Sequence, residues 1–116
     1  MEIGEERSGR SLVIAPSGRL DSVSSGELER VVVARIDAGE RRLAIDMAGV
    51  EYISSAGLRV LLLAAKRLKP PQGVLVLCGI GPSVRTVLDL AGFTSLFAVE
   101  PSRPQALARL ESATAP

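Results

Sequence analysis

Residues 43–68, LAIDMAGVEYISSAGLRVLLLAAKRL, constrain the fold of this chain most strongly, because a short joint connects a strand-like apolar run to a helix-like one. Leu43, Ile45 and Met47 fall on alternate positions, as residues on one face of a strand do. The run that follows Ser55 is apolar on nearly all sides, which is typical of a buried helix. This segment therefore predicts a strand followed directly by a buried helix.

The rest of the chain repeats this alternation of strands and helices. A first helix is expected between a cap at Asp21 or Ser22 and a stop at Gly39, and a third begins at Gly81-Pro82-Ser83. Alternating strands and helices favour a mainly parallel sheet that helices cover. The remaining expected elements are strands over 2–7, 11–20, 41–47, 73–80 and 96–99, and helices over 55–68, ended by Pro70-Pro71, and 104–110.

The length of 116 residues fits a single domain, here taken as residues 1–116, and an apolar fraction of 47% is enough for a core. The predicted fold class is α/β, with a mixed, mainly parallel sheet, an opening hairpin and about four α-helices. The formal net charge is +1 and the chain has one Tyr and two Phe, which disfavours nucleic acid and membrane surfaces as partners. The first residues show no secretory signal, so a cytoplasmic location is expected.

Histidine is absent from the sequence, which excludes the Ser-His-Asp and Cys-His mechanisms and the common zinc ligand sets. No catalytic residues, metal ligands or cofactor loop are expected, and the protein is predicted not to be an enzyme. Cys78 lies inside an apolar run and is interpreted as a small core residue. Gly81-Pro82-Ser83 lacks the further glycines and the lysine of a nucleotide-binding loop, so it is interpreted as a helix start.

Ser54 and Ser55 lie at the predicted start of the second helix, where two interpretations apply. A serine there commonly caps the helix, because its hydroxyl accepts a hydrogen bond from a free backbone N–H of the first turn. The same helix end carries partial positive charge and can hold a phosphate, which suits a phosphorylated hydroxyl. The small residues Ala56 and Gly57 would let a kinase approach, or would allow tight packing against a strand.

Asp21 and Asp46 are carboxylates at or near strand ends, and a parallel sheet would bring both to the edge where Ser55 lies. Asp21 either caps the first helix or contributes an acidic rim that positions a partner. Asp46 is interpreted mainly as a hydrogen-bond acceptor at the end of its strand.

Three groups of residues together resemble the STAS domain of the bacterial anti-sigma factor antagonists, also called anti-anti-sigma factors. The resemblance covers nearly the whole chain. The matching segments are GRLD at 18–21, IDMAGVEYISSAGL at 45–58, and LCGI at 77–80 followed by PSVR at 82–85 and LDLAGF at 88–93.

The resemblance implies partner switching: the unphosphorylated protein binds an anti-sigma factor that is also a serine kinase, which frees the sigma factor. Phosphorylation by that kinase abolishes binding until a serine phosphatase reverses it. Ser55 matches the phosphoacceptor, with Ser54 as the alternative because the family often has Asp at that position. The implied partner-binding residues are Asp21, Ser54, Ser55, Ala56 and Gly57.

The competing hypothesis is a constitutive STAS scaffold, such as a subunit of a lipid-transport or stressosome-like assembly, in which Ser55 only caps its helix. The sequence also leaves the oligomeric state open, since Val23, Val33 and Leu107 could line either the core or an interface.

Overall fold

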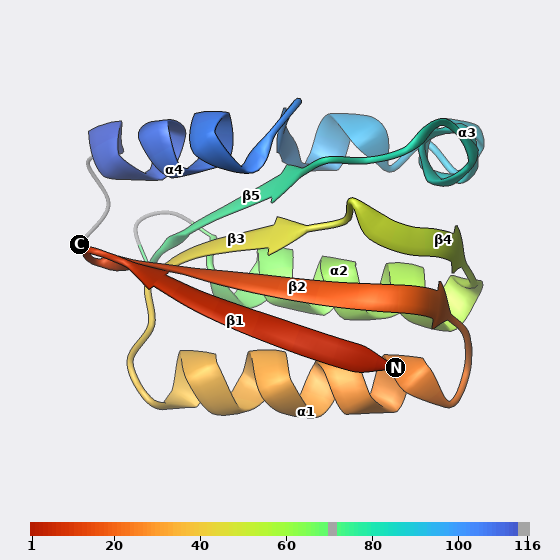
Figure 1. Ribbon diagram of the computed structural model, residues 1–116, viewed down its shortest axis with the longest axis horizontal. Coiled ribbons are helices and arrows are strands. Elements are labelled where there is room, and N and C mark those ends of the chain that lie inside the picture. Colours follow the sequence, from red (N-terminus) through yellow and green to blue (C-terminus); the bar gives the residue numbers. More distant parts are fainter. Residues whose placement is uncertain (70–71, 114–116) are drawn as a thin grey trace.

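The computed structural model describes residues 1–69 and 72–113, which fold into one sheet with helices on both of its faces (Figure 1). The order of elements confirms the predicted alternation of strands and helices. The elements are β1 (Glu2–Ser8), β2 (Ser11–Leu20), α1 (Ser24–Asp37), β3 (Arg42–Asp46), β4 (Gly49–Ile53), α2 (Ser55–Arg67), β5 (Val74–Cys78), α3 (Pro82–Leu90), the 3-10 turn η1 (Thr94–Leu96), β6 (Ala98–Glu100) and α4 (Arg103–Ser112).

The six strands found in the described ranges form a mixed sheet, in the order β1-β2-β3-β5-β6, with β4 beside β2. β1 and β2 form the expected antiparallel hairpin, and every other strand pair is parallel. With four α-helices in the same ranges, the structure confirms the predicted fold class.

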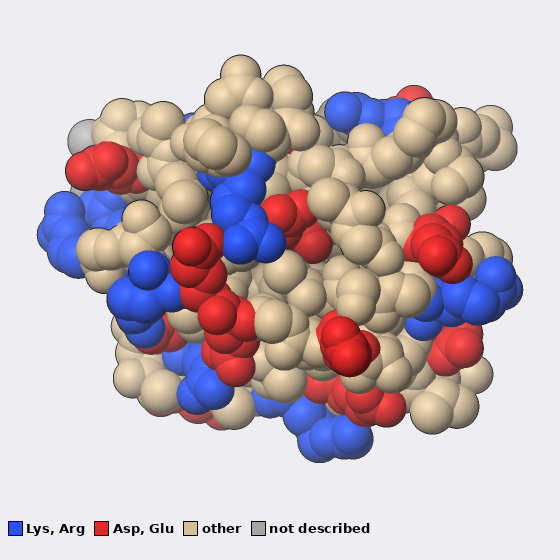
Figure 2. Space-filling view, in the orientation of Figure 1, with Lys and Arg blue, Asp and Glu red and all other residues tan. Residues whose placement is uncertain are grey.

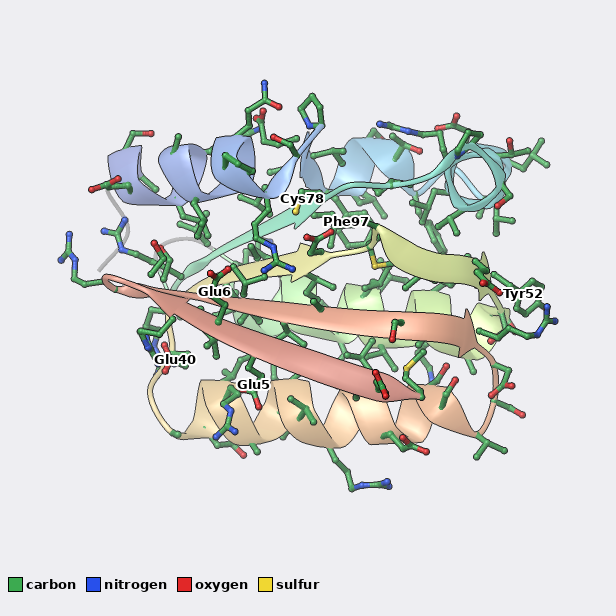
Figure 3. All side chains as sticks on the ribbon, in the orientation of Figure 1. Glu5, Glu6, Glu40, Tyr52, Cys78 and Phe97 are labelled. Carbon is green, nitrogen blue, oxygen red and sulfur yellow. The ribbon has the colours of Figure 1, made fainter. Side chains whose placement is uncertain are left out.

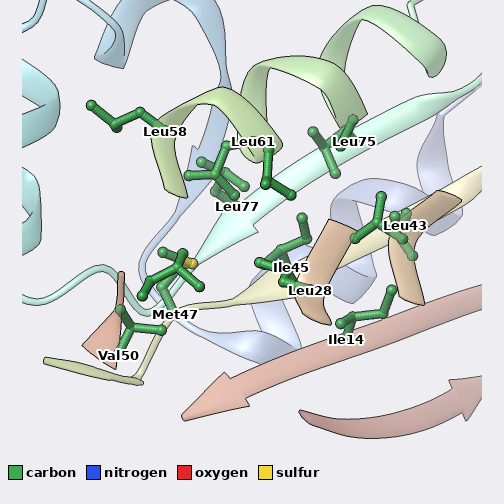
Figure 4. Close-up of a cluster of buried hydrophobic side chains, with 14 of the residues drawn as sticks. Ile14, Leu28, Leu43, Ile45, Met47, Val50, Leu58, Leu61, Leu75 and Leu77 are labelled. Atoms are coloured by element: carbon green, nitrogen blue, oxygen red, sulfur yellow. The ribbon is translucent and has the colours of Figure 1, made fainter. Parts of the chain in front are cut away.

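The core consists of two layers, one on each face of the sheet. Alternate residues of β3 enter different layers: Leu43 and Ile45 join the larger cluster, whereas Ala44 joins the smaller one. The larger cluster includes side chains of α1, α2 and α3, and the smaller one is covered by Ala106 and Leu110 of α4. In Figure 1, α4 lies above the strands and α1 below them, and Figure 4 shows part of the larger cluster. The predicted alternation in this strand is confirmed.

Strand β4 was not predicted, because residues 52–57 were interpreted as a joint before α2 and residues 49–51 were assigned to no element. Only Val50 and Ile53 of its five residues are buried, so it carries little of the apolar signal of a strand. The length of β2 explains why it forms. β2 has ten residues and β3 only five, so β3 pairs with the first part of β2 and β4 pairs with the second. Pro16 lies where β2 changes partner.

The last two elements differ from their predicted bounds. The final strand runs over Ala98–Glu100 instead of 96–99, because residues 94–96 form η1, and the last helix extends over Arg103–Ser112. Pro71 and Pro70, expected to end α2, lie outside the described residues.

Candidate functional site

The predicted site lies where β2 and β4 end side by side. Leu20 and Ile53 are register partners in these parallel strands, so the residues after them, Asp21 and Ser54, emerge at the same end of the sheet. The backbone N–H of Ser54 donates to the carbonyl oxygen of Leu20 at 2.9 Å, which joins the two chain segments directly. The structure thus brings Asp21 together with the two candidate serines.

Ser54 is the N-cap of α2. Its backbone is extended (φ −93°, ψ 173°) and its hydroxyl accepts a hydrogen bond from the N–H of Gly57 at 3.3 Å. The same hydroxyl donates to the carbonyl oxygen of Leu20 at 2.9 Å. Ser54 is half-buried, and its hydroxyl is occupied as both donor and acceptor. The capping interpretation is therefore confirmed for Ser54.

Ser55 is the first residue of α2 and has a different environment. Its side chain is exposed, and its hydroxyl makes no hydrogen bond to any residue that the structure describes. It lies at the helix end where free N–H groups favour an anion. Of the two adjacent hydroxyls, Ser55 is the one that a second protein can reach without breaking a cap.

Gly57 is required by packing inside the domain. A Cβ atom at this position would lie 2.8 Å from Cγ1 of Ile53 and 2.9 Å from Cγ of Leu20, both closer than ordinary carbon contacts. Gly57 is buried, whereas Ala56 is half-buried. Tight packing against a strand thus explains Gly57, which lets the start of α2 approach the ends of β2 and β4.

Asp21 organises the turn that leads into α1. Its Oδ1 accepts hydrogen bonds from the N–H groups of Val23 and Ser24, both at 3.0 Å, and from the hydroxyl of Ser24. The hydrogen bond from the Ser24 N–H is the main cause that lowers the pKa of the Asp21 carboxyl, and the nearby charge of Arg19 contributes. The N-cap residue of α1 is Val23, which has no side-chain cap, so the prediction of Asp21 as the N-cap was wrong by two residues. The Asp21 carboxylate instead closes the turn before the helix, and with its lowered pKa it stays ionised at neutral pH.

Asp46 does not belong to this edge, contrary to the sequence-based expectation. The pairing of Ile14 with Ile45 places Asp46 level with Ala15, and Leu20 lies about 16 Å farther along β2 at the usual rise of a strand. Asp46 is buried and accepts from the N–H of Ala48 at 3.0 Å, as expected for an acceptor at a strand end. The prediction of its position was wrong because it ignored β4.

An ion-paired bridge holds Asp46 in place on the α4 side of the sheet. Nε of Arg103 lies 2.8 Å from Oδ2 of Asp46, and NH1 of the same guanidinium lies 2.8 Å from Oε1 of Glu6. These carboxylate contacts raise the pKa of Arg103, the Asp46 hydrogen bond contributing most. The bridge connects β1, β3 and α4, which is a structural role.

Three exposed side chains near Ser55 were not identified from the sequence as a group. Arg19 of β2 and Tyr52 of β4 are register partners, and the guanidinium carbon lies 4.2 Å from the centre of the tyrosine ring, within cation–π range. Tyr52 is 40% exposed and Val23 is 76% exposed. Figure 3 shows Tyr52 at the end of β4, far from Glu40 at the opposite end of the molecule. Only recognition of β4 would have placed Arg19 beside Tyr52.

The sequence left open whether Val23 lines the core or an interface, and its exposure places it on the surface, outside the core. Val33 and Leu107, which the sequence grouped with it, are half-buried. The backbone N–H of this exposed valine donates to the Asp21 carboxylate, so Val23 adds apolar surface beside the candidate site.

Cys78 and the start of α3 agree with their interpretations. Cys78 is buried in the smaller core cluster, and burial raises the pKa of its thiol to about 11, which makes it an unreactive core residue. Helix α3 begins at Pro82 with Gly81 as its N-cap, so the Gly81-Pro82-Ser83 segment is a helix start.

Acidic and basic side chains are interspersed over the face of the molecule drawn in Figure 2, consistent with the near-zero net charge. In the part of the chain that the structure describes, no group of three or more Cys, Asp or Glu residues could hold a metal ion. Over the same residues, every helix is too short or too polar to cross a bilayer.

Comparison with known proteins identifies the class. The sequence model of the STAS domain matches residues 3–106. A Bordetella bronchiseptica protein named "Putative anti-sigma factor antagonist BtrV" is 42% identical over 113 residues, 97% of each chain. The anti-sigma F factor antagonist of Paenibacillus polymyxa is 25% identical over 115 residues, 96% of each chain.

Solved structures agree with the sequence comparison. The crystal structure of an anti-sigma factor antagonist from Mycobacterium paratuberculosis superposes with a TM-score of 0.88 at 26% identity, covering 96% of this chain and 94% of the other. The chain belongs to the STAS domain family. The resemblance to STAS-domain anti-sigma factor antagonists is confirmed.

Proposed function

We propose that this protein is an anti-sigma factor antagonist controlled by phosphorylation of Ser55. In its unphosphorylated form it binds an anti-sigma factor that is also a serine kinase, and this binding frees the sigma factor. Phosphorylation of Ser55 by the same kinase ends the complex, and a serine phosphatase restores binding. The protein acts by binding and not by catalysis.

The observation that carries this proposal is the different environment of two adjacent serines. The Ser54 hydroxyl accepts from the N–H of Gly57 and donates to the carbonyl oxygen of Leu20. The Ser55 hydroxyl is exposed to solvent at the start of α2 and bonds to no described residue. A kinase can therefore modify Ser55 without dismantling the helix start. The similarity to named anti-sigma factor antagonists supports the partner class.

The surface around Ser55 supports a protein partner. Val23 adds exposed apolar area, and Arg19 stacked on Tyr52 adds a cation and an aromatic ring of the kind enriched at interfaces. Asp21 contributes a carboxylate that stays ionised at neutral pH, because its pKa is lowered. Asp21, Ser54, Ser55 and Ala56 remain the proposed contact residues, with Gly57 positioning them from beneath.

Phosphorylation would act at the interface and leave the fold intact. A phosphoserine adds about 1.5 to 2 negative charges. An interface that forms around a neutral hydroxyl would have to remove water from these charges and hold them near the like-charged Asp21 carboxylate, and both effects weaken binding. A loss of about 3 kcal/mol of binding free energy weakens a complex more than a hundredfold. Within the domain, the free N–H groups at the start of α2 can accommodate the phosphate.

The test is intact-mass and peptide mass spectrometry of the protein incubated with ATP and each serine-kinase anti-sigma factor of its own genome. We expect one phosphate, lost in Ser55→Ala and retained in Ser54→Ala. A phosphate on Ser54, or none with any kinase, would contradict the proposal.

Binding of the same kinase to Ser55→Asp provides the second measurement, with Ser83→Asp as a matched control because Ser83 is an exposed serine in the first turn of α3. We expect Ser55→Asp to weaken binding at least a hundredfold and Ser83→Asp to leave it unchanged. Equal binding of both variants would instead support a constitutive scaffold in which phosphorylation has no role.

A further inference from the structure

We propose that a groove at the far end of α2 from Ser55 binds a small amphiphile with an aliphatic chain and a carboxylate head. The groove has a volume of about 550 Å³ and lies between the C-terminal half of α2, the start of β5, the segment from η1 to β6, and α4. This volume falls in the range of small-molecule sites, roughly 300 to 1,000 Å³.

The groove exists because β6 is shorter than the strand it pairs with. β6 has three residues and its pairing with β5 begins at Val76, so Val74 and Leu75 have no strand on that side within the described residues. Leu96 and Phe97 pass beside this gap without filling it. The sheet edge is therefore hollow next to an apolar surface.

The walls of the groove are mostly aliphatic or aromatic. Leu96 is 57% exposed, although a single exposed leucine is unremarkable by itself. Here it borders a continuous apolar lining, which suits an alkyl chain. The apolar lining residues are Leu62, Ala65, Leu68, Val74, Leu75, Leu96, Phe97 and Ala98.

All charged residues that line the groove are basic. They are Lys66, Lys69 and Arg109, and no Asp or Glu lies among the lining residues. Arg109 pairs with Glu100 at 2.9 Å, whereas Lys66 and Lys69 form no ion pair with any residue that the structure describes. Two ammonium groups without an ion pair to any described residue, beside an apolar groove, favour a ligand with one acidic end.

The size of the groove favours a small molecule over a protein partner. Eleven residues line it, whereas a standard protein interface involves about 20 to 30 residues on each side. The ligand class is therefore a single-chain carboxylate, independent of the phosphorylation proposed at Ser55.

The test uses dodecanoate at submicellar concentration, followed by amide chemical shifts of the full chain. We expect dodecanoate to cause saturable amide shifts that are confined to residues of the groove. The neutral dodecanol should bind about tenfold more weakly, and the cationic dodecyltrimethylammonium should not bind. Two exposed charge contacts together account for a difference of that size. Absence of saturable shifts with dodecanoate, or equal binding of all three amphiphiles, would overturn the proposal.

Three variants connect binding to the groove. Leu96→Asp alters an exposed side chain and should abolish binding, and Lys66→Glu with Lys69→Glu should weaken it about tenfold or more. Arg30→Glu, an exposed charge reversal on α1, should bind as the unaltered protein does. Unchanged binding in the groove variants would overturn the site. So would ligand-free self-association that Leu96→Asp abolishes, because the occupant would then be a second copy of the chain.

Discussion

The division of roles between Ser54 and Ser55 predicts that two adjacent Ser→Ala substitutions have very different effects on stability. Ser54→Ala removes the cap on the N–H of Gly57, which costs about 1 kcal/mol. It also removes the hydroxyl bond to the carbonyl of Leu20, which adds about 0.5 to 1 kcal/mol. The second cost is modest because the backbone N–H of Ser54 still donates to the same carbonyl.

The expected total for Ser54→Ala is about 1.5 to 2 kcal/mol, or a decrease in Tm of about 5 to 10 °C for a domain of this size. Ser55→Ala should change the free energy of unfolding by less than about 0.5 kcal/mol, because the side chain is exposed and makes no hydrogen bond to a described residue. Both substitutions remove the same hydroxyl group, and their positions are adjacent in the sequence, so each variant is the control for the other.

The assay is urea unfolding followed by circular dichroism, with the slope of the transition checked for equality among the three proteins. If Ser55→Ala were at least as destabilising as Ser54→Ala, the assignment of Ser54 as the cap of α2 would be refuted. A stability change within about 0.5 kcal/mol for both variants would show that neither hydroxyl is engaged.

Three further perturbations test the packing and the electrostatics. Gly57→Ala should destabilise the domain by about 1 to 3 kcal/mol in urea unfolding, because its Cβ would lie 2.8 Å from Ile53, whereas Gly26→Ala in α1, with its nearest atom at 3.8 Å, should be neutral or stabilising. The lowered pKa of Asp21 gives a stabilisation that is complete above the unfolded pKa of about 3.9 and is lost as the pH falls toward the folded value. The stability difference between the unaltered protein and Asp21→Asn should therefore shrink below about pH 4, and a difference independent of pH would contradict this. Cys78, with its pKa at about 11, should resist iodoacetamide at pH 8 in the native state and react in urea, as mass spectrometry would show.

The strands and helices whose buried apolar residues recur at regular spacing could be predicted from the sequence. β2 was predicted with its observed bounds, and β3, β5 and α2 within one or two residues, because their apolar residues follow the period of a strand or of a buried helix. β4 lacked that signal, since three of its five residues face solvent. Its formation depends on the open half of β2, which is a tertiary effect.

The sequence was enough to group Asp21, Ser54 and Ser55 in one candidate site, but not to tell which of the two serines caps α2. Ser54 and Ser55 are chemically identical, and only the extended backbone at Ser54 and the nearby carbonyl of Leu20, 34 residues earlier, make one of them the cap. The misplacement of Asp46 has the same origin, because without β4 the sheet edge was assumed to lie at the end of β3.

The length of β2 thus determines how the site is assembled. By pairing first with β3 and then with β4, β2 carries Asp21 to the same end of the sheet as Ser54 and Ser55. The same pairing stacks Arg19 on Tyr52 and leaves Val23 exposed beside them. Gly57 then allows α2 to begin against both strand ends, with the exposed Ser55 as its first residue. Under the proposed function, a charge added at Ser55 would change the exposed surface and leave the Ser54 cap and the Gly57 contacts beneath it in place.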